Sequence, residues 1–322
     1  MIARPIRTFA AALLVMAAPA FGQTYPSRPI HIFVPTGPGT PPDIISRVVA
    51  KAVADKEGWQ VVVENKPGAV QTIAGSEVLK RPADGYSLYA LSLPVTAAPA
   101  FLPNMPFQPD KSFAPVAKLS TSYNVLVVTP SLKVNSVADL VALLKKEPNK
   151  LTFSSGGFGT PAHLIGEMFK LEEHVQATHV PYAEMPQAIG DLISGTNQFM
   201  FITTLPVVGL IETGKLHALA VTGPKRIAAL PDVPTVGEQG HPELAVEDWV
   251  GLSMKSGTPP AVIEKINAAV NRALTTAAVR TAFAKLGAEP AGGAPEQFGA
   301  FVHAQVEHWT EIVHKSGMKI HQ

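Results

Sequence analysis

Short apolar runs rich in β-branched residues alternate in this chain with segments whose apolar residues recur at helical spacing. The run IHIFVP (30–35) predicts a buried strand, and the apolar spacing over 44–53 predicts a helix after it. Strands are expected next at 60–64 and 86–92, with a helix at 72–80 between them. Strands joined by helices in this order form a parallel sheet with right-handed crossovers, so the pattern predicts an α/β fold.

The alternation resumes after a proline-rich stretch at 94–115, which we expect to interrupt it. In this second series, strands are expected at 124–129, 151–155, 177–181, 198–202 and 216–222, and helices at 136–146, 162–171, 187–193 and 207–213. A late strand at 249–254 and three helices at 260–276, 279–286 and 296–314 end the chain.

Two series of strands and helices predict two α/β lobes. Residues 23–123 and 249–322 are expected to form lobe 1, and residues 124–248 lobe 2. The strands at 125–129 and 249–254 are the candidates for crossing between them. The last helices are expected to pack back on lobe 1, with the apolar stripe of the final helix in the core. A two-lobe protein of this kind suggests a ligand site between the lobes.

The N-terminal segment has the pattern of an export signal. Arg4 and Arg7 precede a short apolar run at 9–18, and small residues follow it up to Gly22. The run is too short to span a bilayer, and the alternative is a buried N-terminal helix. Because no cysteine follows the run, a lipoprotein anchor is excluded. We expect residues 1–22 to be a signal peptide and the mature chain to be periplasmic.

Composition excludes several classes of function. The chain has no cysteine, so disulfide scaffolds, zinc ribbons, iron–sulfur clusters and thiol catalysis are excluded. Its 26 basic and 25 acidic residues give no basic surface typical of nucleic-acid binding. No metal-ligand motif such as H-E-x-x-H is present, and we expect neither a metal nor a cofactor. Without coiled-coil heptads, a monomer is the expected state.

Two loops of similar design each join a predicted strand to a predicted helix. The first reads PTGPGTPPD (35–43) and the second SSGGFGTPAH (154–163). Ligands of open α/β sheets lie beyond the carboxyl ends of the strands, where helix N-termini attract anions. Neither loop contains Lys or Arg, so a carboxylate would be held there by hydroxyls and amides. The alternative is local: Thr40 and Thr160 would be helix N-caps, with Asp43 completing a capping-box variant.

Catalytic and nucleotide-binding motifs are weak. Gly157 to Ala162 mimics the dinucleotide fingerprint G-x-G-x-x-A, but it does not follow the first strand and lacks the acidic residue about 20 positions on. There is no P-loop, and no G-x-S-x-G motif surrounds Ser155. An exported esterase that uses Ser154 or Ser155 stays open as the alternative function.

Several segments in order carry a resemblance to a known family. They include YPSRPIHIFVPTGPGTPPD (25–43), PADGYSLYA (82–90), LTFSSGGFGTPAHLIGEMFK (151–170), THVPYAEMPQAIGDLISG (178–195) and DVPTVGEQG (232–240). These segments resemble the Bug-type solute receptors of tripartite tricarboxylate transporters over essentially the whole mature chain. The resemblance implies a periplasmic binding protein of the type II fold, with two hinged lobes that close around a small carboxylate. It also implies delivery of that ligand to the membrane permease of the transporter.

The resemblance and the loop chemistry together predict the ligand site. In the family, the two loops hold the carboxylates, partly through ordered waters. The predicted ligand-binding residues are Thr36, Gly37, Gly39, Thr40, Ser92, Ser154, Ser155, Gly156, Phe158, Thr160, His163 and Ile202.

Three departures from the family pattern bear on the ligand. Pro41 and Pro42 replace residues with amide donors in the first loop. Ile202 stands where relatives often have an acid, which argues against an amino-acid ligand. Phe158 in the second loop would pack on a flat ligand or point into the core. We therefore expect a carboxylate with an apolar body, such as the aromatic dicarboxylate terephthalate.

Overall fold

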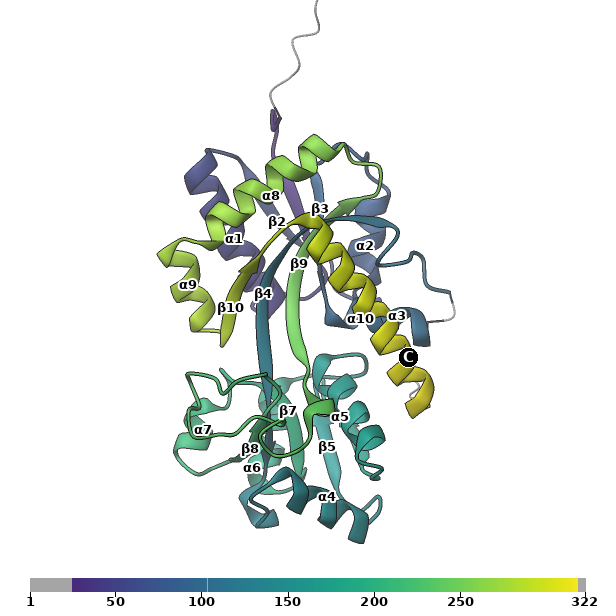
Figure 1. Ribbon diagram of the computed structural model, residues 1–322, viewed down its shortest axis with the longest axis vertical. Helices are drawn as coiled ribbons and strands as arrows, with labels where there is room; N and C mark the ends of the chain where they lie inside the picture. Colours follow the sequence, from purple (N-terminus) through teal and green to yellow (C-terminus); the bar gives the residue numbers. More distant parts are fainter. Residues whose placement is uncertain (1–24, 103, 318–322) are drawn as a thin grey trace, which may run out of the picture.

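The computed structural model describes residues 25–102 and 104–317 (Figure 1). The predicted signal peptide lies outside this range. No helix in the described part of the chain is both long enough and apolar enough to cross a membrane. The strands are β1 (Ile30–Val34), β2 (Val61–Asn65), β3 (Ser87–Ser92), β4 (Phe113–Val128), β5 (Thr152–Ser155), β6 (Thr178–Pro181), β7 (Phe199–Thr203), β8 (His217–Val221), β9 (Glu247–Lys255) and β10 (Ala288–Gly292).

Helices connect these strands and cover their faces. The helices are α1 (Pro41–Glu57), α2 (Thr72–Leu79), α3 (Leu93–Phe101), α4 (Val137–Lys146), α5 (Pro161–Glu172), α6 (Met185–Ser194), α7 (Val208–Glu212), α8 (Pro260–Leu274), α9 (Ala277–Ala284) and α10 (Pro295–Ser316). Three single turns of tighter helix are η1 (Ala69–Gln71), η2 (Pro130–Leu132) and η3 (Pro242–Leu244).

One long strand, β4, belongs to two groups of strands. Its residues 113–123 pair with β9, and β9 pairs in turn with β3 in the order β2-β1-β3-β9-β4. Its residues 124–128 pair with β7 and β8, and the order continues β4-β7-β5-β6. We call the group of β1, β2, β3, β9 and β10 the first sheet, and the group of β5 to β8 the second sheet. In Figure 1, β4 and β9 run along the long axis of the molecule.

Three apolar clusters hold these layers together. One lies between the first sheet and the helices α1, α8 and α9. Another, with Ala188 and Leu192, packs on the second sheet. The largest contains residues of both sheets, together with α3, α5 and α10. The apolar stripe of α10 is buried in it, as expected, and includes Phe298 and Trp309.

The structure corrects three expectations. Helix α3 forms within the proline-rich stretch because Pro94 lies in the first turn, where its missing N–H costs no hydrogen bond. The strand expected at 124–129 is the end of a strand of 16 residues. Strand β10, which pairs with β4, was not expected, since Pro290 and Gly292 disguise it. Helix α10 packs on α3 and β4, as expected of the last helix, and it also contacts α5.

Candidate functional site

Strand directions bring the predicted loops to facing edges. β3 and β4 are both antiparallel to β9, and β1 and β2 are parallel to β3, so all four run the same way. Because β4 runs from the first sheet into the second, β1, β2 and β3 end at the edge that faces the second sheet. β7 is antiparallel to β4, and β5 and β6 run with β7. Strands β5, β6 and β7 therefore end at the edge that faces the first sheet.

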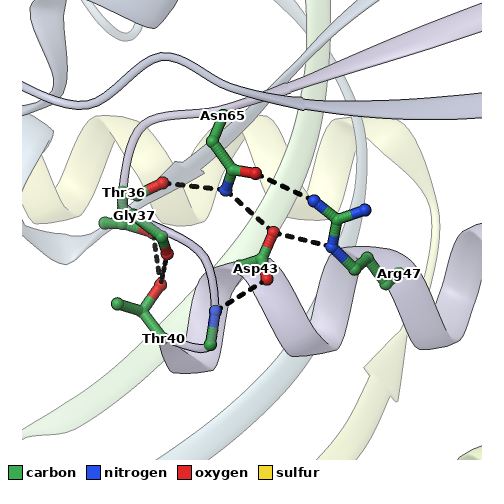
Figure 2. Close-up of polar contacts among 7 residues, drawn as sticks. Thr36, Gly37, Thr40, Asp43, Arg47 and Asn65 are labelled. Carbon is green, nitrogen blue, oxygen red and sulfur yellow. Dashed lines mark hydrogen bonds and ion pairs between the residues drawn. The ribbon is translucent and has the colours of Figure 1, made fainter.

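The first loop, residues 35–40, follows β1 and is held by a polar network (Figure 2). The Thr40 hydroxyl donates to the carbonyl of Gly37 at 2.8 Å, and it accepts from the Thr36 hydroxyl at 2.7 Å. Asn65, at the end of β2, donates from Nδ2 to the carbonyl oxygen of Thr36 at 2.9 Å. The loop is thereby tied to the neighbouring strand as well as to itself.

Asp43 anchors this network from the first turn of α1. Its buried carboxylate accepts from the Gly39 amide at 2.9 Å, from Asn65 Nδ2 at 2.8 Å and from Arg47 Nε at 2.9 Å. Burial by itself would raise the pKa of Asp43, but these hydrogen bonds and the Arg47 charge outweigh it and lower the pKa. Asp43 is thus ionised at neutral pH, and Arg47 balances its charge. The first loop presents no net negative charge to an anion.

The second loop, residues 154–160, follows β5 and rests on two histidines. Ser155 Oγ lies 2.7 Å from His179 Nε2, and His179 belongs to the neighbouring strand β6. The amide of Gly159 donates to His163 Nδ1 at 3.2 Å, and the Thr160 hydroxyl donates to the carbonyl of Gly157 at 2.7 Å. Every one of these contacts lies within the loop or beneath it.

The histidines belong to a cluster of four rings that are packed together. His163 and His179 lie 4.3 Å apart between ring centroids, and the His179 ring stacks 4.8 Å from the Phe153 ring. The Phe158 ring stands edge-on to both imidazoles at 5.3 and 5.1 Å. Burial, then the neighbouring His179 and then the charge of Lys170 lower the pKa of His163 to about 3. Burial and then the charge of Lys170 lower the pKa of His179 to about 4. Both rings are neutral at pH 7.

The capping interpretation of the two threonines is wrong in detail. Thr40 and Thr160 do occupy the N-cap positions of α1 and α5, but neither side chain accepts a hydrogen bond from its helix. Asp43 accepts from Gly39 rather than from the N-cap residue, so no capping box forms. No side chain caps the first turn of either helix. Instead, both hydroxyls donate backwards, to carbonyls of their own loops.

The helix that begins at Pro161 offers more backbone donors than the helix that begins at Pro41. Prolines remove two first-turn N–H groups from α1 but only one from α5. The Asp43 amide is left in α1, and the amides of Ala162 and His163 are left in α5. Free amides at a helix start carry the positive end of the helix dipole and attract anions.

The remaining predicted residues lie at the same edges but differ in exposure. Ser92, at the end of β3, is buried and accepts a hydrogen bond from Gln71 Nε2 at 2.6 Å. Ser154 is buried, and its hydroxyl has no partner among the described residues. Gly156 is partly exposed, and a Cβ at this position would lie 3.0 Å from the end of the Met185 side chain. Ile202, near the end of β7, is buried in the apolar cluster of the second sheet.

Three features of this edge were not expected from the sequence. Asn65 and His179 organise the two loops, yet each is far in sequence from the loop it holds. Residues Ala69, Val70 and Gln71 follow β2 with φ of 46°, 49° and 74°, values that non-glycine residues rarely adopt. Strain of this kind is concentrated at functional sites, and no sequence signal other than the preceding Pro-Gly marks it here.

Two further arrangements bear on catalysis and metal binding. Ser155 and His179 resemble part of a catalytic triad, but His179 Nδ1 is buried and has no hydrogen-bond partner in the described chain, so no carboxylate orients the ring. Glu173, His241 and Glu243 lie close enough to hold a metal ion. His241 Nδ1 is 2.5 Å from Glu173 Oε1, so a hydrogen-bonded pair between α5 and η3 accounts for this group.

Comparison with known proteins identifies the family. The model of the tripartite tricarboxylate transporter family receptor, TctC, matches residues 45–318. The chain is 34% identical over 307 residues to protein BugT of Bordetella pertussis, which covers 95% of this chain and 94% of that protein.

Solved structures agree with this match. Periplasmic binding protein BugD has a TM-score of 0.78 at 31% identity, covering 92% of this chain and 99% of its own. R. palustris Rpa4515 with adipate has a TM-score of 0.80 at 30% identity, again covering 92% of this chain and 99% of its own. This chain has the α/β fold of the periplasmic binding proteins and belongs to the TctC family of tripartite tricarboxylate transporter receptors.

Proposed function

We propose that this receptor binds a dicarboxylate between its two sheets, one carboxylate at the start of α1 and the other at the start of α5. The observation that carries this proposal is the convergence of two uncapped helix starts on facing edges. Each loop brings hydroxyls and backbone amides and no net charge of its own. Hydrogen bonds to a charged group contribute roughly 1.5–3 kcal/mol each, so a few of them suffice for tight binding.

The ligand class follows from what lines the edges. Rpa4515, a structural relative, holds adipate, an aliphatic dicarboxylate. In this chain, the half-buried Phe158 and the apolar Ile202 favour a ligand whose body is apolar. We propose an aromatic dicarboxylate such as terephthalate, with the twelve residues named from the sequence as the site.

The motion proposed for binding is a hinge between lobes divided at 123/124 and 248/249. This division is supported by the change of partners along β4, from β9 to β7 and β8, at residue 124. A ligand that contacts both lobes stabilises the closed arrangement through its higher affinity for it. We further propose that residues 1–22 export the chain to the periplasm, that it works there as a monomer, and that it delivers its ligand to the permease subunits of a tripartite transporter.

A titration of the mature protein tests the function. Aliphatic and aromatic mono- and dicarboxylates are added while tryptophan fluorescence and the melting temperature are followed. Trp249 on β9 and Trp309 on α10 are buried reporters near the two sheets. A ligand at one hundred times its Kd adds ~2.7 kcal/mol to the apparent stability. If no carboxylate changes either signal, the proposal is wrong, and if only aliphatic diacids do, the aromatic ligand class is wrong.

A second candidate is an esterase built on the 2.7 Å contact between Ser155 and His179. It predicts hydrolysis of a chromogenic ester that Ser155→Ala abolishes. The buried Nδ1 of His179, which lacks a partner in the described chain, favours the receptor over this alternative.

A further inference from the structure

The two histidines beneath the second loop hold it from opposite ends. His179 reaches Ser155 from β6, and His163 reaches Gly159 from the first turn of α5. His163 is 2% exposed, so its side chain belongs to the interior, and its backbone amide is the part proposed to meet the ligand. The loop residues Gly157 and Gly159 have φ of 108° and 75°, a backbone form that glycine adopts readily and other residues rarely do.

His179 fixes the conformation of the second loop at its end nearer β5. Ser155 Oγ lies 3.1 Å from both the amide and the carbonyl of Gly157 and 2.7 Å from His179 Nε2. The Gly157 amide donates to the hydroxyl, whose one proton goes either to the Gly157 carbonyl or to the imidazole. In both cases the ring fixes where the hydroxyl points and, through it, the turn at Gly157.

His163 controls the other end. Its Nδ1 accepts the Gly159 N–H, which requires that nitrogen to be unprotonated. The Gly159 amide therefore points inward to the imidazole, and it is not a donor to the ligand in this arrangement. The donors left toward the facing sheet are those at the start of α5.

We propose that His163 and His179 are positioning residues of the second loop. As neutral imidazoles they fix Gly159 and Ser155, and so they keep the backbone N–H groups at the start of α5 available to a carboxylate. The effect on ligand rests on the proposed function, whereas the effect on the loop is a property of the free protein. Lys170 is the charged group that acts on both rings, and it is paired with Glu167 at 2.9 Å. The support beneath the loop is therefore neutral.

The chain allows variants that separate packing from hydrogen bonding. His179→Phe keeps a ring against Phe153 and Phe158 but removes the contact to Ser155, whereas His179→Gln returns an amide group close to the place of Nε2. His163→Leu removes the acceptor, and His163→Asn returns one close to the place of Nδ1. The control is His217→Gln, an exposed histidine at the start of β8. If His179→Phe does not fold, Ser155→Ala removes the same contact by deleting the Ser155 hydroxyl.

The free protein is measured first, with ¹⁵N-labelled glycine. The Gly157 amide signal is expected to shift in His179→Phe and in Ser155→Ala, and the Gly159 signal in His163→Leu. Both signals stay near their original places in His179→Gln, His163→Asn and the control. If they are unchanged in the Phe, Ala and Leu variants, or if the amide variants disturb them equally, the positioning role is overturned.

The folded variants are then titrated with terephthalate and with adipate by calorimetry. Affinity for the acid that binds is expected to fall about tenfold in the Phe and Leu variants and less than threefold in the amide variants. Equal affinity in all variants overturns the inference. If the original protein binds neither acid, the ligand class proposed above fails, and the glycine signals alone decide whether the histidines position the loop.

Discussion

The two loops place a helix start at the edge of a sheet by opposite physical means. The first loop depends on charge: Asp43 is ionised, balanced by Arg47 and hydrogen-bonded to Asn65 and to the loop amide of Gly39 (Figure 2). The second depends on neutral rings that are packed beneath it. The stabilising contribution of the ionised Asp43 is lost only below pH 3.8, whereas that of the two neutral imidazoles begins to be lost below pH 6.5, because the unfolded chain protonates its histidines there. Loops with the same task should therefore fail under different conditions.

Phe153→Ala should give the largest loss of stability, and it changes the packing beneath the second loop only. Phe153 is fully buried and stacks on His179 and on Phe199, so its loss leaves a cavity beneath the loop. We expect the free energy of unfolding to fall by about 4 kcal/mol. Urea unfolding measures it, with the exposed Ile73→Ala as control. A loss below 1 kcal/mol would mean that the ring cluster is not a packed core.

Asp43→Ala should come next, because it breaks the network of the first loop. It leaves the Gly39 amide and Asn65 without their shared acceptor, and we expect a loss of about 3 kcal/mol in unfolding free energy. Asp55→Ala removes an exposed ion pair on the same helix and should cost less than about 0.5 kcal/mol. Equal effects of the two substitutions in urea unfolding would refute the special role of Asp43.

Acid should separate the two loops. The pKa values of His163 and His179 are lowered on folding, so their stabilising contribution is complete above pH 6.5 and is lost as the pH falls toward 4 and 3. At pH 5 the loss is on the order of 2 kcal/mol for a buried imidazole. The pKa of Asp43 is also lowered, so its contribution is lost only below its ordinary value of 3.8.

Urea midpoints at pH 7 and pH 5 measure this difference. A variant with both His163→Asn and His179→Gln should lose stability less steeply between these values than the original protein. Burial raises the pKa of Asp248 to about 6, which acts in the opposite direction, but this group is common to both proteins and cancels in the comparison. Parallel pH profiles would show that the histidines do not carry the acid sensitivity.

The smallest effects should come from the loop hydroxyls themselves. Thr36→Val and Thr160→Val each remove one hydroxyl that donates within its own loop in the free protein and that we propose turns to a carboxylate on binding, so each should weaken binding about tenfold. Calorimetric titration with the acid that binds gives the ratio, and Thr213→Val, an exposed change at the end of α7, is the control. If Thr36→Val or Thr160→Val binds the acid with unchanged affinity, the hydroxyl of that threonine does not contact the ligand.

Local patterns predicted most of the fold because apolar spacing is a local signal. The alternating strands and helices, the family and the two loops follow from segments of 5 to 20 residues. Where prolines hide the pattern, as in α3 and β10, the prediction was wrong, because partners far along the chain stabilise these elements. The start of β4 was missed for a related reason, since Pro115 lies at an irregular point of its pairing with β9.

The support of the site could not be predicted in the same way. His179 holds Ser155 only because β6 lies beside β5 in a fixed register, which places residues 24 positions apart in contact. Asn65 likewise reaches the first loop through the pairing of β1 with β2. Sequence patterns indicate which residues follow a strand, but sheet register decides which side chains meet beneath them. That Thr40 and Thr160 donate to their own loops also depends on backbone geometry that the motif does not encode.

The most direct test of two carboxylate sites is to remove one carboxylate from the ligand. Terephthalate and adipate are compared by calorimetry with their monoamides, which keep the length and the body of the ligand but carry one charge. We predict that the diacid that binds does so about 100-fold more tightly than its monoamide, since each helix start requires its own anion. If the monoamide binds as tightly as the diacid, only one helix start holds a carboxylate and the proposal of two matched sites is wrong.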